Sequence, residues 1–175
     1  PKDVVSGDFY WADECNDRFY FSVVDCTGHG VPGAMVSIIG YNGLNRCLKE
    51  QNLVEPSVIL NNLTTFVEDT LNNDEKEMRD GMDMSLCSLD RSSNMLTYSG
   101  ANNAIYVLSD GELHEHKPDK QPVGKFPRRT EFTNHKIQLK TGDAVYLFTD
   151  GYADQFGGEK GKKLKYKAFK HIIRT

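Results

Sequence analysis

The sequence predicts an α+β fold in which a sandwich of two antiparallel β-sheets is flanked by helices. Three observations lead to this expectation. The chain has 175 residues, of which 38% are hydrophobic, enough for one domain with a substantial core. Its patterns form separate runs: two strand-like segments, two helix-like segments, and then a series of further strand-like segments. Segregated runs are typical of α+β domains, whereas a parallel sheet would need strands and helices in alternation.

The first part of the chain is expected to form a β-hairpin followed by a helix. Val4–Trp11 and Arg18–Val24 read as strands, and the polar segment Asp13–Asp17 between them predicts a turn. A glycine-rich loop follows at Cys26–Pro32. Apolar residues at helical spacing then predict a helix over Gly33–Lys49.

A second long helix and a short closing helix are also predicted. Pro56–Leu71 has apolar residues at helical spacing, so that one face of this helix would be apolar. A polar, charged connection follows at Asn72–Gly81. Leu164–Ile173 has the amphipathic pattern of a short helix at the end of the domain.

Six strands are predicted between these two helices. The Asp110-Gly111 pair is a strong signal for a two-residue hairpin turn, and a long loop with several prolines is expected at Lys117–Arg129. The strands themselves are expected at Met82–Leu89, Met95–Gly100, Ala104–Leu108, Glu112–His116, Phe132–Leu139 and Ala144–Thr149.

Composition and charge limit the classes of function. A net charge of −4 argues against nonspecific nucleic-acid binding, so no nucleic-acid partner is expected. No apolar run approaches the roughly 18–20 residues that a membrane-spanning helix needs. The four cysteines lack CxxC spacing, so they are expected to be reduced thiols of a cytoplasmic protein rather than zinc ligands. Because the chain begins with Pro1, residues 1–175 are expected to be a single domain cut from a longer multidomain regulator, which missing segments could anchor to a membrane.

Four aspartates beside or within apolar runs carry the strongest functional signal. Asp25 and Asp150 end strand-like runs and precede glycine-bearing loops, which would put both carboxylates at the mouth of a sheet. Asp83 lies inside a predicted strand and Asp8 between apolar neighbours, where a carboxylate is disfavoured unless paired or bound. Clustered carboxylates repel one another unless a cation neutralises them, and such oxygen donors suit Mg²⁺ or Mn²⁺. These residues favour a metal-dependent enzyme that acts on phosphate groups.

The loop after Asp25, CTGHGVPG, combines three glycines with a histidine and a proline. Gly28 and Gly30, which flank His29, permit unusual backbone conformations and close backbone approach. The N–H groups of this loop and of the following helix start could hold an anion. The segment is not a P-loop, because no Gly-Lys-Ser/Thr follows. An ordinary turn before a helix is the alternative interpretation.

Six segments in sequence order carry a more specific signal: SGDFYW, VVDCTGHGVPGAMVS, GMDMSLCSLD, LTYSGANNAIYVL, KQPVG and YLFTDGYAD. Together they resemble the SpoIIE-type branch of the metal-dependent serine/threonine protein phosphatases, the PPM superfamily. The resemblance runs from about Val5 to about Phe169, nearly the whole chain. It implies a PPM phosphatase-like sandwich of two antiparallel sheets flanked by helices, with a binuclear Mn²⁺ or Mg²⁺ centre at one end.

The resemblance also implies a role for each aspartate. The residue matching Asp25 bridges both metal ions in that family, and the next residue, here Cys26, contributes a backbone carbonyl. Asp83 and Asp150 match ligands of one ion, and Asp8 serves the other, partly through water. The two ions would lower the pKa of a shared water, orient it for in-line attack on phosphorus and neutralise the phosphoryl charge. The four aspartates are thus the implied catalytic set.

Three features depart from the family pattern. Cys26 replaces the usual glycine, which keeps the carbonyl but places a thiol beside the site. His29 is separated from Asp25 by three residues, whereas the Asp-Gly-His run of the eukaryotic relatives has one, so its role as general acid is not carried over. Those relatives also place an arginine phosphate clamp ahead of the first acidic motif. This chain has Lys2 and Asp3 there, so no clamp is assigned.

The activity that the resemblance implies is hydrolysis of phosphoserine or phosphothreonine on a regulatory protein. In the bacterial branch the usual substrate is a phosphorylated anti-sigma-factor antagonist, and the catalytic domain commonly follows an upstream sensor domain. A homodimer is an assembly that the sequence leaves open. The alternatives are a non-catalytic signalling or binding domain with the same fold, and a phosphatase for a small phosphoester. A domain without turnover would be expected to lose some of the four aspartates, and all are present.

Overall fold

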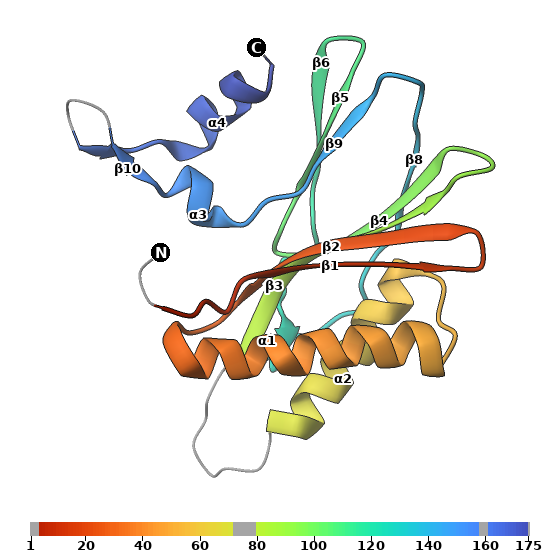
Figure 1. Ribbon diagram of the computed structural model, residues 1–175, viewed down its shortest axis with the longest axis vertical. Coiled ribbons are helices and arrows are strands. Elements are labelled where there is room, and N and C mark those ends of the chain that lie inside the picture. The colour runs from red at the N-terminus through yellow and green to blue at the C-terminus, as the bar shows by residue number, and fades with distance from the viewer. Residues whose placement is uncertain (1–3, 72–79, 158–160, 175) are drawn as a thin grey trace.

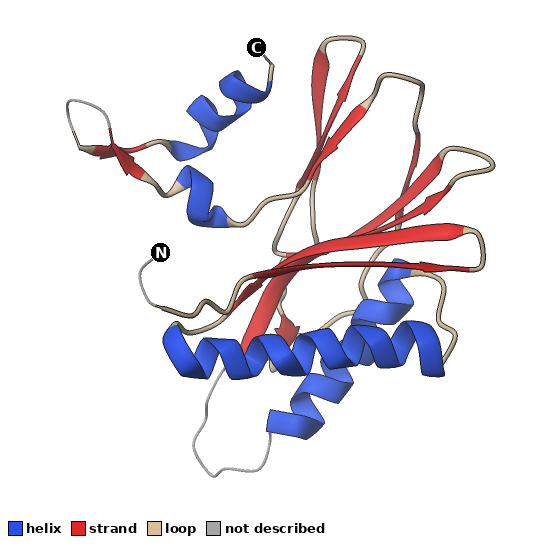
Figure 2. Cartoon of the chain, viewed as in Figure 1, coloured by secondary structure: helices blue, strands red, loops and turns tan. Residues whose placement is uncertain are grey.

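The computed structural model describes residues 4–71, 80–157 and 161–174, which form stacked layers of sheet and helix. Helices α1 (Gly30–Asn45) and α2 (Pro56–Leu71) cover one face of the larger sheet, and the smaller sheet lies on its other side (Figure 1). Figure 2 shows the same layers by secondary structure, with α1 and α2 below the strands. The sandwich of two antiparallel sheets flanked by helices, predicted from the sequence, is confirmed.

Both sheets are antiparallel throughout their named strands. The larger one has the spatial order β1 (Phe9–Cys15), β2 (Arg18–Cys26), β3 (Gly81–Asp90), β4 (Met95–Ala101), β8 (His135–Gln138), and the short β7 (Val123–Gly124) also pairs with β3. The smaller one has the order β6 (Glu112–His116), β5 (Ile105–Ser109), β9 (Ala144–Tyr146).

The first hairpin is longer and more tightly turned than expected. Asn16 and Asp17 both have positive φ angles, 52° and 61°, and they alone form the turn. Two consecutive left-handed residues give a turn whose twist matches that of paired strands, so pairing continues to Cys15 opposite Arg18. The turn predicted at Asp13–Asp17 is therefore mostly strand, and the strand predicted from Val4 begins at Phe9.

Helix α1 starts three residues earlier than predicted. Its first residue is Gly30, and Pro32 lies in the first turn, where the missing N–H has no helical acceptor in any case. The helix continues into a π-helical turn, η1 (Arg46–Glu50). Gly43 faces α2, and a Cβ atom there would collide with the side chains of Leu63 and Phe66, so glycine sets how closely the helices approach.

Most other boundaries agree with expectation to within a residue, and the differences fall on short elements. α2 and β6 have the predicted bounds, while β8 and β9 are shorter than predicted. β7 lies inside the predicted loop Lys117–Arg129. The sequence did not predict α3 (Asp150–Ala153) or the hairpin of β10 (Phe156–Gly157) and β11 (Lys162–Lys163), which precede α4 (Lys165–Ile173). Of the predicted connection Asn72–Gly81, residues 72–79 lie outside the described part.

Two separate cores hold the layers together. The larger lies between the helices and the larger sheet and includes Trp11, Leu44, Leu63 and Met82, all buried. The smaller lies between the two sheets and is built from Cys87, Leu96, Tyr98, Ile105 and Val107. Within the described ranges, no helix has both the length and the apolar character required to cross a bilayer.

Candidate metal centre

Two of the four predicted aspartates lie opposite one another on neighbouring strands. The antiparallel register of β2 and β3 pairs Asp25 directly with Asp83. Side chains paired in this way have Cβ atoms roughly 4.5–5.5 Å apart, and like charges at such positions destabilise a sheet. Both residues are half-buried near the end of the larger sheet where β2 leads into α1. The sheet itself therefore brings two carboxylates together.

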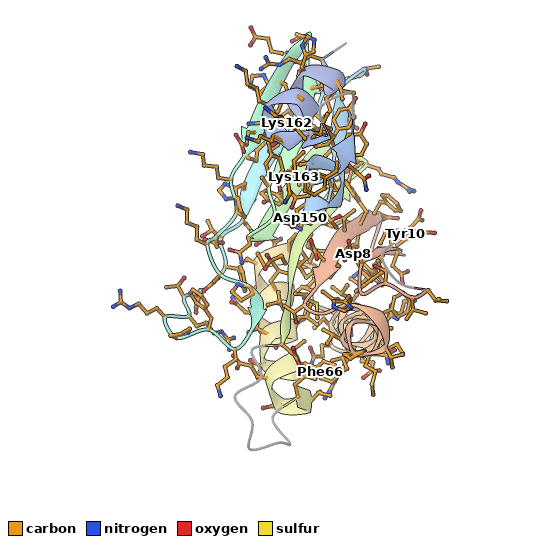
Figure 3. The ribbon with its side chains drawn as sticks, turned by 90° about the vertical axis from the view of Figure 1, so that its left-hand side faces the viewer. Asp8, Tyr10, Phe66, Asp150, Lys162 and Lys163 are labelled. Atoms are coloured by element: carbon orange, nitrogen blue, oxygen red, sulfur yellow. The ribbon has the colours of Figure 1, made fainter. Side chains whose placement is uncertain are left out.

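The other two aspartates approach this pair from outside the sheet. Asp8 lies just before β1, and Asp150 is the first residue of α3, at the end of the segment that follows β9. In Figure 3 the labels of Asp8 and Asp150 are close together at the middle of the molecule. The carboxyl of Asp25 is hydrogen-bonded to that of Asp8 and is influenced by the charges of Asp150 and Asp83. All four carboxylates singled out by the sequence thus lie in one electrostatically linked cluster around Asp25.

Convergence changes the acid–base behaviour of the two strand aspartates. Burial, followed by the charges of Asp8 and Asp150, raises the pKa of the Asp25 carboxyl to about 7. Burial is also the main cause of the raised pKa of Asp83. A hydrogen bond from Asn102 opposes that shift, and the charge of Asp150 adds to it. Without a cation, part of the Asp25 population is therefore protonated at neutral pH.

Asn102 is a site residue that the sequence analysis did not find. Its Nδ2 donates a hydrogen bond of 2.8 Å to Oδ1 of Asp83, and its backbone is left-handed with a φ of 55°. The β3–β4 register, with Ser85 opposite Gly100, places Asn102 next to Asp83 when extended by two residues. The sequence signal for this site residue was therefore a polar residue, Asn102, directly after β4, at the end of that strand that lies beside Asp83.

The glycine loop after Asp25 is tightly held against the start of β3. Thr27 donates from its backbone N–H to the Gly81 carbonyl (3.0 Å), and its hydroxyl accepts from the Gly81 N–H (2.9 Å). Gly28 and Gly30 have positive φ angles of 88° and 65°, as expected from their need for unusual conformations. His29 is the exposed residue that precedes the first turn of α1 and makes no side-chain capping bond there.

Cys26 occupies the position next to Asp25 and is buried, with 4% of its surface exposed. Burial, with smaller contributions from the charges of Asp8 and Asp25, raises the pKa of the thiol to about 12. A thiol with such a pKa carries almost no thiolate at neutral pH, so it is a weak nucleophile. The thiol that the sequence placed beside the site is therefore shielded from ready oxidation.

Donor chemistry in this cluster fits a hard divalent cation, although the side chains as they stand do not form a closed cage. Four carboxylates and the Cys26 carbonyl are oxygen donors of the kind that Mg²⁺ and Mn²⁺ prefer. Among the residues that the structure describes, no three His, Cys, Asp or Glu side chains gather closely enough to hold one ion. The close relations are pairwise, between Asp25 and Asp8 and between Asp25 and Asp83. Ion binding would thus draw the carboxylates closer together.

Residues of α3 and α4 complete the surroundings of the cluster. The phenol of Tyr166 has a raised pKa, caused first by burial and then by the charges of Asp150, Asp154 and Asp25, so α4 lies near the carboxylates. Asp154 follows the last residue of α3 and forms an ion pair of 2.6 Å with Lys163.

Comparisons with known proteins identify the family of this fold. Residues 16–175 match the family described as Stage II sporulation protein E (SpoIIE). The SiaA-PP2C domain of Pseudomonas aeruginosa is 32% identical, with a TM-score of 0.87 over 99% of this chain and 68% of that one. No curated protein sequence gives a significant match.

Two more distant solved structures share the fold. The RsbU and RsbW domains of a Mycobacterium tuberculosis protein are 22% identical, with a TM-score of 0.72 over 91% of this chain. The PP2C phosphatase domain of SpoIIE from Bacillus subtilis, solved with a fragment of its regulatory domain, is 17% identical, with a TM-score of 0.69 over 87% of this chain. This chain spans 43% of each of those two chains.

Proposed function

The chain belongs to the SpoIIE family of PP2C-like phosphatase domains, and from that premise we propose that it is a metal-dependent phosphatase for phosphoserine or phosphothreonine on a regulatory protein. The observation that carries this proposal is the convergence of Asp8, Asp25, Asp83 and Asp150 from four separate segments. The raised pKa values of Asp25 and Asp83, to which the charges of Asp8 and Asp150 contribute, show that the charged cluster is unfavourable in a metal-free fold, and bound divalent cations would make it favourable.

We assign the cation-binding role to the four aspartates and the Cys26 carbonyl, which would hold two Mn²⁺ or Mg²⁺ ions. A solved relative in fold, RsbX, is described in complex with magnesium; it is 14% identical, with a TM-score of 0.64. When bound, such ions lower the pKa of a coordinated water and offset the charge of the phosphoryl oxygens.

The remaining residues of the site position this set. Asn102 fixes one oxygen of Asp83 by its hydrogen bond, which leaves the other oxygen to face a ligand. Thr27 holds the Asp25 loop to β3, so the strands that carry Asp25 and Asp83 cannot separate easily. Hydrolysis through water requires no nucleophilic side chain, and accordingly we propose no phosphoenzyme intermediate. We assign no general-acid role to His29, which lies at the N-cap position of α1.

The proposed physiological substrate is a phosphorylated signalling protein, such as an anti-sigma-factor antagonist. The solved relatives include the RsbU and RsbW domains in one chain and a SpoIIE phosphatase domain with part of a regulatory domain. We extend this arrangement to the present chain as a phosphatase domain that an upstream sensor controls.

The test is hydrolysis of p-nitrophenyl phosphate with Mn²⁺, with Mg²⁺ and with chelator, in the wild type and in Asp25→Asn and Asp150→Asn. Turnover that needs the metal and is lost in both variants is the expected result. Glu131→Gln, an exposed carboxylate outside the cluster, is the control and should retain turnover. Metal-independent turnover, or turnover that both aspartate variants retain, would refute the proposal. A protein that binds Mn²⁺ by calorimetry and never turns over would support the non-catalytic alternative.

A further inference from the structure

A pocket of about 530 Å³ opens beside the carboxylate cluster, on the side of Asp83 and Asn102. Its inner wall includes Thr27 and two carboxylates, Asp80 and Asp83, so the cations of the pocket lie on the opposite wall. Its outer wall is formed by the segment that follows β7, including Lys125, Phe126 and Arg128. Of the four aspartates of the cluster, only Asp83 lines this pocket, so the pocket lies at one side of the cluster.

The outer wall is held in a fixed position relative to Asp83. Gly124 of β7 pairs with Gly81 of β3, and a Cβ atom added to Gly124 would lie 2.9 Å from the Asp80 carbonyl oxygen. Gln121 closes the base of the segment, because its side chain donates to the Thr130 carbonyl (2.7 Å) and accepts from the Thr130 N–H (2.9 Å). The segment between these anchors is therefore a tied loop rather than a free one.

The same segment is strongly basic. Residues 120–130 contain four lysines and arginines and no acidic residue, in a chain whose net charge is −4. Arg129 is engaged, because it forms an ion pair with Glu68 of α2 (3.2 Å). Lys125 and Arg128 are exposed at the pocket, and within the described ranges neither has an ion pair or a hydrogen bond. Two cations are thus available for an anionic ligand.

We propose that this pocket binds an acidic segment of the phosphoprotein substrate beside its phosphorylated residue, with Lys125 and Arg128 contacting carboxylates and Phe126 and the neighbouring prolines contacting apolar side chains. The inference rests on the proposed phosphatase function and deepens it. A role for the two cations in holding the phosphoryl group is disfavoured, because Asp8, Asp25 and Asp150 do not line the pocket. The cations instead stand where residues flanking the phosphate would pass.

The first measurement is binding, which does not depend on turnover. Two short fluorescein-labelled phosphothreonine peptides are compared in chelator by fluorescence anisotropy, one flanked by Glu and Leu and the other identical except for Gln in place of Glu. The wild type should bind the Glu peptide about tenfold more tightly than the Gln peptide, with a difference that shrinks as salt is raised. Lys125→Gln and Arg128→Gln should each reduce that preference about threefold to fivefold.

Lys136→Gln is the matched control, because Lys136 is an exposed lysine of β8 that lines no part of this pocket. It removes the same charge and should leave the preference unchanged. Arg128→Glu should shift the preference toward a Lys-flanked peptide. Equal binding of the Glu and Gln peptides by the wild type, or an equal loss in Lys136→Gln, would overturn the inference.

Turnover of p-nitrophenyl phosphate separates this inference from the proposed function. Selective binding of the Glu peptide by a protein that hydrolyses no phosphoester in Mn²⁺ or Mg²⁺ would refute the phosphatase and retain the acidic-segment site. Metal-dependent turnover without selective binding of the Glu peptide would support the phosphatase and refute the acidic-segment site. If Arg128→Gln lost p-nitrophenyl phosphate turnover in proportion to Glu-peptide binding, the cation would hold the phosphoryl group itself, and the inference would be wrong.

Discussion

Replacing Asp25 with asparagine should stabilise the metal-free protein at neutral and alkaline pH. The carboxyl of Asp25 is half-buried, faces Asp83 across the β2–β3 ladder and is hydrogen-bonded to Asp8, and its pKa is raised from 3.8 to about 7. Because the folded state keeps a proton that the unfolded state releases, the folded state is favoured at low pH. Its stability falls as pH rises from about 4 to about 7.

The magnitude follows from the size of the shift. A shift of this size corresponds to at most about 4 kcal/mol, at about 1.4 kcal/mol for each pKa unit. Asp25 is only half-buried, so solvent screening reduces the expected effect to about 1–2 kcal/mol. Asparagine has nearly the same shape and cannot ionise. At pH 8 in chelator, the variant should therefore be more stable than the wild type by that amount, and the difference should vanish near pH 4.

Urea denaturation in chelator at several pH values is the assay. With an m-value of about 2 kcal/mol/M, the midpoint of Asp25→Asn at pH 8 should be higher by about 0.5–1 M. Asp90→Asn is the matched control. Hydrogen bonds from Ser92 and Ser93 lower the pKa of Asp90, so this replacement should not stabilise the protein. A variant at Asp25 that is less stable than the wild type at pH 8, or a stability difference independent of pH, would refute the reasoning.

Three further outcomes are expected. Gly43→Ala should lower stability by about 1–2 kcal/mol in urea denaturation, because overpacking against α2 outweighs the gain in helix propensity; a stabilised variant would contradict this. Gly124→Ala should lower the melting temperature and weaken binding of the Glu peptide, because the φ of 134° and the contact with the Asp80 carbonyl disfavour a side chain; unchanged values of both would count against the tied loop. Iodoacetamide should modify half-buried Cys15 before Cys26 in the native protein, as followed by mass spectrometry, and prior reaction of Cys26 would show its thiol to be accessible.

Long periodic segments were predictable from the sequence because their patterns are self-contained. α2 has its predicted bounds, and the Asp110-Gly111 hairpin forms with both residues at positive φ, 52° and 79°. The first hairpin was misjudged because a polar stretch was taken as loop, whereas the pairing partner in β2 extends the strand through it. β7 could not be found, because two residues carry no periodicity and pair only through contact with Gly81 of distant β3.

The sequence predicted the charged aspartates of the candidate site but not the residues that surround them. Asp25 and Asp150 could be found because a carboxylate directly after an apolar run can be recognised from the local sequence alone. Asn102 was missed, since an asparagine before a strand is ordinary turn chemistry until the β3–β4 register sets it beside Asp83. The same holds for Lys125 and Arg128, whose relation to the cluster depends entirely on the pairing of β7 with β3.

The division of the interior into two cores has a consequence for hydrogen exchange. Asp25 and Asp83 lie on strands packed against the larger, fully buried core, so amides of β2 and β3 should exchange only when the whole domain unfolds. Asp150 belongs instead to a segment between short β9 and α4, a helix without a buried residue, and its amides should exchange through small local openings. A cation bound by Asp25, Asp83 and Asp150 would connect strands whose amides exchange most slowly to a segment whose amides exchange fastest. Slower exchange on adding Mn²⁺ should therefore be confined mainly to α3 and α4, where the protein has the most local freedom to lose.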